Sequence, residues 1–314
     1  VSFMLSACNF YMPIFEEALD AYGLPLELRY LPIIESALNP SAVSRAGASG
    51  LWQFMIGTGK IYGLESNSLV DERRDPIKAT WAAARYLKEM YDIYGDWNLV
   101  IAAYNCGPGT INKAIRRANG ETDYWKIYNY LPKETRGYVP AFIAANYVMT
   151  YYCDHNICPM ETNIPASTDT VQVNKNLHFE QIADLCNVPL DQIKSLNPQY
   201  KKHMIPGDSK PYTLRLPIDA ISTFIDKQDT IYAHRADELF RNRKTVAVKE
   251  ITPSTRKTTA AVAGKGKLTY YTIKSGDTLS TIAGKYGVTI KDIQRWNGMS
   301  NTKIAAGKRL KIYK

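Results

Sequence analysis

The sequence predicts a multidomain protein in which a mainly α-helical domain is followed by two small α+β modules of the βααβ type. From about residue 10 to residue 156, apolar residues recur at helical spacing, and the alternation typical of strands is lacking. After Pro159 the character of the sequence changes, and residues 170–216 resemble residues 270–312. At 314 residues the chain is long enough for one sizeable core and one or two small domains.

Proline and glycine residues mark the ends of the predicted helices. Pro25 fits the first turn of a helix that Asn39-Pro40 is expected to end. Pro76 opens a longer helix, which Gly95 ends. Further helical segments of the first domain are expected at residues 98–104 and 134–152.

The two similar segments share apolar and polar positions, which indicates that they are copies of one module. The matched positions are Ile182 and Ile282, Val188 and Val288, Ile193 and Ile293, and Asn197 and Asn297. Each copy is expected to contain a strand, two short helices and a closing strand. A helical stretch and a flexible linker at 252–267, rich in Thr, Ala, Lys and Gly, separate the copies. The predicted domains are residues 1–160, the first module at 168–218, the helical segment with the linker at 219–267, and the second module at 268–314.

The formal charge of +9 favours anionic partners such as nucleic acid, a membrane surface or acidic cell-wall polymers. Basic residues are dense at 235–267, in a segment that also has the composition of a linker. A solvated tail explains them better than nucleic-acid binding, because no recognition element accompanies the charge. We therefore expect no nucleic-acid partner.

Membrane association is not decided by the sequence. No apolar stretch approaches the length that spans a bilayer, so no transmembrane helix is expected. The chain begins with Val1, which is compatible with removal of a leader. Leu5-Ser6-Ala7-Cys8 matches a lipoprotein cleavage box superficially, but the charged and apolar regions of a signal are missing before it. We interpret Cys8 as an ordinary helix residue, and a peripheral or lipid-anchored association with a membrane stays open.

Five cysteines form no recognisable disulfide framework. Cys153 and Cys158 are close enough in sequence for a small disulfide or for half of a metal site. No second pair of ligands follows at a zinc-type spacing, so we expect no metal and no other cofactor.

One carboxylate is distinguished by its neighbours. Glu35 lies in the segment Pro-Ile-Ile-Glu-Ser-Ala-Leu-Asn-Pro at residues 32–40, near the end of a predicted helix. Loss of water disfavours the charged form of a carboxyl group and raises its pKa. We therefore expect Glu35 to serve as a general acid near neutral pH.

Four blocks in the first half of the chain resemble, in order, the signatures of lytic murein transglycosylases. They are Glu-Ser at 35–36, Ala-Val-Ser-Arg-Ala-Gly-Ala-Ser-Gly-Leu-Trp-Gln-Phe-Met at 42–55, Ala-Tyr-Asn-Cys-Gly-Pro-Gly at 103–109, and Glu-Thr-Arg-Gly-Tyr-Val-Pro at 134–140. The string as a whole resembles the membrane-bound D group of this family. The resemblance implies a lysozyme-like helical fold for the first domain.

The second repeat resembles a LysM module, a βααβ fold that binds glycans containing N-acetylglucosamine. The resemblance is carried by residues 271–279, 282–283 and 286–288 and by Asn297. It implies that the glycan is bound by Ser275, Gly276, Asp277, Thr278 and Leu279. The first repeat has Asn-Lys-Asn-Leu-His-Phe at 174–179 in place of this loop. We expect it to share the fold, and its glycan binding is left open.

The family resemblance also implies a mechanism. Cleavage of a glycosidic bond requires a proton for the leaving oxygen and stabilisation of the positive charge on the sugar. The motifs offer no second carboxylate comparable with Glu35, and the charged residues at 71–75 are expected to form a surface ion-pair cluster. The resemblance implies that the N-acetyl group of the substrate stabilises the cation. Glu35 then acts as a base on the 6-hydroxyl of muramic acid, which leaves a 1,6-anhydro end.

The resemblance further implies a set of substrate-binding residues. They are Ser36, Ser44, Gly50, Gln53, Met55, Tyr104, Asn105 and Tyr138. Ser44 and Tyr104 are expected to hydrogen-bond the N-acetyl group or the carboxyl group of Glu35. Gln53 and Asn105 would orient the substrate, Met55 would line the cleft, and Gly50 would permit close approach of the backbone. For Trp52 and Phe54, sugar stacking and packing in the core both stay open.

The expected function is non-hydrolytic cleavage of the β-1,4 bond between N-acetylmuramic acid and N-acetylglucosamine in peptidoglycan. The expected partner is the glycan strand, and the expected location is the bacterial cell envelope, in the periplasm or at the outer membrane. One alternative is a hydrolytic muramidase resembling goose-type lysozyme, which a second carboxylate in the cleft would favour. The other is a non-enzymatic LysM protein that only binds peptidoglycan.

Overall fold

The computed structural model describes residues 1–161, 164–165, 167–240, 268–274, 277–297, 299, 304–305 and 307–313. It divides into two compact units, Val1–Thr252 and Pro253–Lys314, which are described separately. The predicted linker at 252–267 lies outside the described residues.

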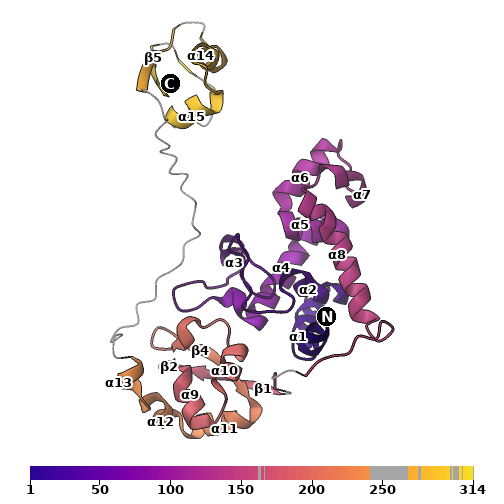
Figure 1. The fold of residues 1–314 in the computed structure, drawn as a ribbon, viewed down its shortest axis with the longest axis vertical. Helices are drawn as coiled ribbons and strands as arrows, with labels where there is room; N and C mark the ends of the chain where they lie inside the picture. The colour runs from indigo at the N-terminus through magenta and orange to yellow at the C-terminus, as the bar shows by residue number, and fades with distance from the viewer. Residues whose placement is uncertain are drawn as a thin grey trace. The chain divides into compact units, whose positions relative to one another are not determined.

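The first part of the larger unit is helical, and its helices enclose one hydrophobic core (Figure 1). Its elements are α1 (Ser2–Ala21), η1 (Leu26–Tyr30), α2 (Leu31–Ser36), α3 (Ile56–Ile61), η2 (Glu72–Arg74), α4 (Pro76–Tyr94), α5 (Trp97–Cys106), α6 (Pro108–Arg117), α7 (Tyr124–Ile127), η3 (Tyr128–Tyr130) and α8 (Lys133–Thr150). Helix α4 packs against α1 and α5, and α8 packs against α5 and α2. These contacts bring α2, which carries Glu35, next to α8.

The predicted ends of α4 are confirmed, whereas the predicted end of the helix that carries Glu35 is wrong. In α4, Pro76 is the first residue, and Gly95 closes the helix with a φ of 63°. The other helix begins as the 3₁₀ segment η1 and ends as α2, before Asn39-Pro40. It ends there because Ala37 and Leu38 both adopt left-handed backbone conformations, with φ of 52° and 59°. The resulting turn places the side chain of Leu38 in the core.

The cysteines do not form a cross-link in the structure. All five thiols are free, including those of Cys153 and Cys158, which follow α8 in the chain. Cys8 lies within α1. Among the described residues, no helix is long and apolar enough to cross a membrane.

In the first module, β1 (Thr168–Val173) pairs with β4 (Tyr212–Pro217) in antiparallel register. Helices α9 (Phe179–Cys186) and α10 (Leu190–Leu196) lie between these two strands in the sequence. A second antiparallel strand pair, β2 (Asn176–His178) with β3 (Met204–Pro206), is an addition that the repeat pattern did not predict. The remaining elements are η4 (Lys201–His203), α11 (Ile218–Asp226), α12 (Gln228–Ala233) and α13 (Ala236–Leu239). The side chain of Gln181 is fully buried and donates to the carbonyls of Tyr232 and His234, which connects the C-terminal end of α12 to the module.

The smaller unit contains the second module, with β5 (Leu268–Thr272), α14 (Leu279–Tyr286), α15 (Ile290–Asn297) and β6 (Arg309–Tyr313). Strands β5 and β6 are antiparallel. Asn197 and Asn297 make the same contacts in the two modules. Each amide donates to a carbonyl one turn earlier in its helix, and each accepts from and donates to the closing strand. The repeat therefore reflects a shared fold.

The segment between α3 and η2 joins the helical part to the first module within the larger unit. Leu69 and Val70 are buried in the core of the module, and Val70 forms an isolated β-bridge with Tyr200. The backbone of Asp71 donates to Gln199 at 2.8 Å, and the backbone of Lys201 donates to Leu69 at 2.6 Å. The module and the helical part thus share packed residues and backbone hydrogen bonds.

The prediction of a surface ion-pair cluster at residues 71–75 is wrong. Asp71, Glu72 and Arg73 are buried, with exposed fractions of 1%, 5% and 5%. The density of charged residues suggested a surface, but these side chains can be buried because they form ion pairs within the protein. Asp71 pairs with Arg73, and Glu72 pairs with Lys78. Burying ion pairs requires such partners. The remaining acid, Asp75, caps α4 by accepting from two backbone amides.

Candidate active site

Glu35 lies in the last turn of α2, with a half-buried carboxyl group that accepts a hydrogen bond from the hydroxyl of Tyr138. Burial raises the pKa of Glu35 to about 7, the hydrogen bond from Tyr138 opposes that rise, and the negative charge of Glu134 adds to it. A carboxyl group with this pKa is partly protonated at neutral pH. It can therefore donate a proton and later accept one.

Tyr138 is the hydroxyl partner of Glu35, and it comes from α8, which begins with a different motif of the sequence. Burial and the charge of Glu35 raise the pKa of Tyr138 well above its ordinary value, so the phenol stays protonated as a donor. Tyr104, one of the two expected donors to Glu35, instead donates to the carbonyl of Trp52 at 2.7 Å. Trp52 is fully buried, and its carbonyl requires a partner there. The proposed contact of Tyr104 with an N-acetyl group stays a prediction.

Ser44, the other expected donor to Glu35, lies on the surface and stabilises its own loop. Its hydroxyl accepts from the backbone of Ala48 at 3.0 Å, and its backbone amide donates to the carbonyl of the same residue. Among the contacts described for the Glu35 carboxyl, the hydroxyl donor is Tyr138 and not Ser44. A contact between Ser44 and bound substrate stays a prediction.

Gly50 and Gln53 shape the loop that Ser44 begins. Gly50 has a φ of 89°, and a Cβ atom there would lie 1.7 Å from the carbonyl oxygen of Arg73. The close approach that requires glycine is therefore to the protein's own backbone, rather than to a substrate. The amide of Gln53 donates to the carbonyl of Gly50 at 2.8 Å and to that of Ala42 at 3.3 Å. In this structure the side chain of Gln53 closes the loop.

Ser36 and Asn105 connect elements around Glu35. The hydroxyl of Ser36 lies 2.9 Å from the carbonyls of Pro32 and Leu51, so it links α2 to the loop. The side-chain oxygen of Asn105 accepts from the hydroxyl of Thr135 at 2.8 Å, which links α5 to α8. Both residues hold the site together, and their contact with substrate stays a prediction.

The side chains that follow Gly50 divide between the core and the surface. Trp52 and Phe54 are buried, and the indole of Trp52 donates to Thr80 at 2.9 Å. Packing in the core is therefore the role that the structure supports for both residues. Met55 is 45% exposed, which leaves its side chain available to a ligand.

Glu134 is an acidic residue near the site that sequence reasoning missed. It lies in the first turn of α8, and its charge contributes to the raised pKa of Glu35. Glu134 and Tyr138 are four residues apart, and this spacing places both on one face of a helix. Glu134 belongs to the fourth sequence block, in which no carboxylate comparable with Glu35 was expected, and it differs from Glu35 in being exposed.

The residues predicted to bind glycan in the second module mainly support its fold. Leu279 is buried in the core, and Thr278 caps α14 in a reciprocal arrangement with Thr281. The carboxylate of Asp277 accepts from the hydroxyl of Tyr271 and from the backbone of Lys274, both at 2.8 Å. Ser275 and Gly276 lie outside the described residues. Glycan binding by this loop stays a prediction.

Half-buried Glu35, with its raised pKa, lies in a helical domain that is followed by two βααβ modules. Family models match each of these parts: a transglycosylase SLT domain matches residues 12–127, a lytic transglycosylase MltD LysM-like domain matches residues 167–233, and a LysM domain matches residues 271–312. The predicted fold class, a helical lysozyme-like domain followed by LysM modules, is confirmed.

The chain is similar to known proteins along most of its length. It is 33% identical over 294 residues to membrane-bound lytic murein transglycosylase D of Escherichia coli strain K12, which covers 92% of this chain and 60% of that protein. It is 33% identical over 124 residues to the soluble lytic murein transglycosylase of the same strain, which covers 38% of this chain and 19% of that protein. A solved structure of the 70 kDa soluble lytic transglycosylase of Escherichia coli aligns with 29% identity and a TM-score of 0.40, over 46% of this chain and 24% of that one.

The chain belongs to the lytic transglycosylase family, with the SLT and LysM arrangement of the membrane-bound D type. It spans 60% of the length of the D-type relative that it matches.

Proposed function

We propose that this protein is a lytic transglycosylase that cleaves the β-1,4 bond between N-acetylmuramic acid and N-acetylglucosamine in peptidoglycan. The observation that carries the proposal is Glu35, a half-buried carboxyl group with a pKa of about 7 and a protonated phenol as its hydrogen-bond partner. Family membership supplies the substrate class. No metal is needed for the proposed chemistry.

In the first step, protonated Glu35 donates its proton to the glycosidic oxygen as the bond to the anomeric carbon breaks. The carbonyl oxygen of the substrate's own N-acetyl group stabilises the positive charge at that carbon. The hydroxyl of Tyr138 stabilises the carboxylate that forms on Glu35, because hydrogen bonds to charged acceptors are strong.

In the second step, the Glu35 carboxylate removes the proton from the 6-hydroxyl of the same muramic acid residue. The oxygen attacks the anomeric carbon, which closes a 1,6-anhydro ring and returns Glu35 to its protonated form. No water is consumed, and the two products together contain all atoms of the substrate.

A hydrolytic muramidase is the second candidate, and the specific observation in its favour is Glu134. The charge of Glu134 contributes to the raised pKa of Glu35. Glu134 is also exposed at the start of α8, where a carboxylate is able to activate water. The family matches favour the transglycosylase, because they name lytic transglycosylases. The products separate the two candidates: the anhydro end is one water lighter and resists borohydride reduction.

We further propose that the protein works on glycan strands of the bacterial cell envelope, in the periplasm, and that the second LysM module tethers it there. The D-type relative is named membrane-bound, and this name supports attachment of the protein to a membrane. A tethered binding module raises the local concentration of an insoluble substrate. The net charge of +9 aids attraction to an anionic wall.

The test is digestion of purified peptidoglycan followed by mass spectrometry of the muropeptides. The wild-type protein is expected to release anhydro-muropeptides. Glu35→Gln is expected to lower the rate by about 10³-fold, because it removes the group that protonates the glycosidic oxygen. Glu27→Gln is the matched control, since Glu27 is an exposed carboxylate in η1. Reducible muramic acid ends would replace this proposal with hydrolysis, and an unchanged rate in Glu35→Gln would remove Glu35 from the mechanism.

A further inference from the structure

The loop at residues 44–54 is fixed to the helix that carries Glu35. Ser36, the next residue in α2, contacts the carbonyl of Leu51 at 2.9 Å, and Tyr104 contacts the carbonyl of Trp52 at 2.7 Å. Within the loop, the backbone of Ser49 donates to Phe54, and the backbone of Gly50 donates to Ala42 just before the loop. A shift of this loop would therefore change the surface that a substrate bound at Glu35 contacts.

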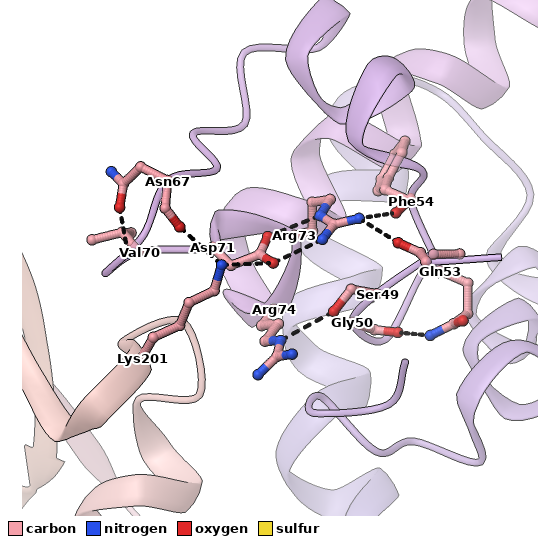
Figure 2. Close-up of polar contacts among 12 residues, drawn as sticks. Ser49, Gly50, Gln53, Phe54, Asn67, Val70, Asp71, Arg73, Arg74 and Lys201 are labelled. Carbon is pink, nitrogen blue, oxygen red and sulfur yellow. Dashed lines mark hydrogen bonds and ion pairs between the residues drawn. The ribbon is translucent and has the colours of Figure 1, made fainter. Parts of the chain in front are cut away.

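Arg73 contacts the loop at two carbonyl groups, and Figure 2 shows its contact with Phe54. Its guanidinium donates to the carbonyls of Gly47 and Phe54, each at 2.9 Å. Two further donors of the same group reach the carboxylate of Asp71, each at 2.8 Å. Arg74 adds a contact to the hydroxyl of Ser49 at 3.0 Å. Because Arg73 is buried, its orientation depends on Asp71.

Asp71 in turn is held by the first module. Lys201, in η4 of the module, places its ammonium 3.6 Å from the carboxylate of Asp71 and 2.9 Å from the carbonyl of Asn67. Figure 2 shows this side chain reaching across from the module to Asp71. Burial alone would raise the pKa of Asp71, but Arg73 and Lys201 together hold that pKa below its ordinary value. Asp71 is therefore charged when the loop is in place.

We propose that the first LysM-like module is a fixed part of the catalytic unit, and that Lys201 is a positioning residue that orients the loop at 44–54 through Asp71 and Arg73. Only the expected effect of Lys201 on enzyme kinetics rests on the proposed lytic function. The expected effect on the position of the loop does not. The module's own features support a structural role. Its core contains Leu69 and Val70 from the helical part, and the ammonium of Lys201 is directed at the junction.

Lys201→Met tests the proposal, because it keeps the length of the side chain and removes its charge. Lys202→Met is the matched control, since Lys202 is the exposed neighbour in the same turn. Hydrogen–deuterium exchange of the full chain measures the loop directly. Amides in residues 44–54 are expected to exchange at least about tenfold faster in Lys201→Met than in the wild type or the control, while amides of α5 are unchanged.

The kinetic readout uses soluble, peptide-free glycan strands as substrate. A displaced loop weakens substrate binding more than proton transfer by Glu35. We therefore expect KM to rise about fivefold in Lys201→Met, with kcat changed less than about twofold. Lys201→Arg keeps the charge and is expected to restore both the exchange pattern and KM.

Equal loop exchange in Lys201→Met and Lys202→Met would overturn the proposal. Faster exchange spread equally over the loop and α5 would also overturn it, because that result indicates general destabilisation. The two proposals fail separately. If the wild-type protein releases no cleaved glycan, the proposed function fails, and the exchange measurement still decides whether Lys201 positions the loop.

Discussion

Two shielded carboxylates in the helical part of the chain, Glu35 and Asp71, have pKa values that move in opposite directions. Glu35 is half-buried, its hydrogen-bond donor is the neutral phenol of Tyr138, and its pKa rises to about 7. Asp71 is more deeply buried, yet its pKa falls, because Arg73 and Lys201 oppose the effect of burial. Burial on its own would raise the pKa of both groups. The charge of the hydrogen-bond partner decides whether the net pKa rises, as in Glu35, or falls, as in Asp71.

This difference separates a carboxylate suited to proton transfer from one suited to holding structure. A neutral partner leaves Glu35 able to gain and lose a proton near neutral pH. A bidentate guanidinium keeps Asp71 charged and fixes the direction of Arg73. The two groups are connected through the loop at 44–54, which contacts α2 on one side and Arg73 on the other.

The largest expected effect on stability comes from Asp71→Asn. The substitution leaves the buried guanidinium of Arg73 without a counter-charge, and we expect a loss of about 3–5 kcal/mol in the free energy of unfolding. Denaturant titration of the full chain measures it. Asp154→Asn, at an exposed position after α8, is the control and is expected to change stability by less than about 0.5 kcal/mol. A loss in Asp71→Asn no larger than in the control would show that the ion pair does not hold this region.

Glu35→Gln is expected to have the opposite effect on stability. The pKa of Glu35 is higher in the folded chain than in the unfolded chain, so the folded state binds more protons between pH 4.5 and about 7. The wild type therefore loses stability as the pH rises through this range. Glu35→Gln removes this loss and is expected to be more stable above pH 7 by up to about 3 kcal/mol. For Asp71 the sign is reversed, since its contribution is present above its unfolded pKa and is lost as the pH falls.

Unfolding measured at pH 5 and pH 8 tests this contrast. The difference in stability between Glu35→Gln and the wild type is expected to grow from the lower to the higher pH. The control Glu27→Gln should follow the wild type at both values. A difference that is independent of pH would contradict a raised pKa at Glu35.

Tyr138→Phe is expected to have a smaller effect, on the pH dependence of activity. The hydroxyl lowers the pKa of Glu35, so its removal raises that pKa further above its ordinary value. The first step requires protonated Glu35, and kcat/KM of the wild type should fall as the pH rises through about 7. In Tyr138→Phe this fall is expected about one pH unit higher, with a lower maximum because the forming carboxylate loses its donor.

The comparison substitution is Tyr147→Phe, which removes a hydroxyl from an exposed position on the same helix. Its profile should coincide with that of the wild type. If the fall in kcat/KM stays at the same pH in Tyr138→Phe, the hydrogen bond seen in the structure does not act on Glu35 in solution.

Local signals in the sequence predicted the parts of the fold that depend on neighbours along the chain. Pro76 and Gly95 marked α4 correctly, because each acts on its own backbone. Contacts between distant segments could not be predicted in this way. Tyr138 and Glu35 are 103 residues apart, and no local pattern indicates that their helices meet. The cluster at 71–75 has the composition of a surface, and only its tertiary partners make it a buried support.

The smallest expected effect belongs to Glu134→Gln, and it moves the activity profile in the opposite direction to Tyr138→Phe. Glu134 is exposed, and water screens its charge, so its influence on Glu35 is weak. Removing the charge lowers the pKa of Glu35, and the fall in kcat/KM is expected at a pH lower by less than about one unit. Raising the salt concentration should reduce the difference between this variant and the wild type.

The products of Glu134→Gln also distinguish the two candidate reactions. A transglycosylase needs no second carboxylate, so anhydro ends should still form at a rate within about tenfold of the wild type. If Glu134 activates water, the variant should lose activity about 10²-fold or more, and the wild type should release reducible ends. Glu121→Gln is the control, because Glu121 is an exposed carboxylate paired only with Lys126 among the ion pairs described for it. If the pH at which kcat/KM falls shifts only slightly and the products are unchanged, the role of Glu134 is limited to an electrostatic effect on the pKa of Glu35.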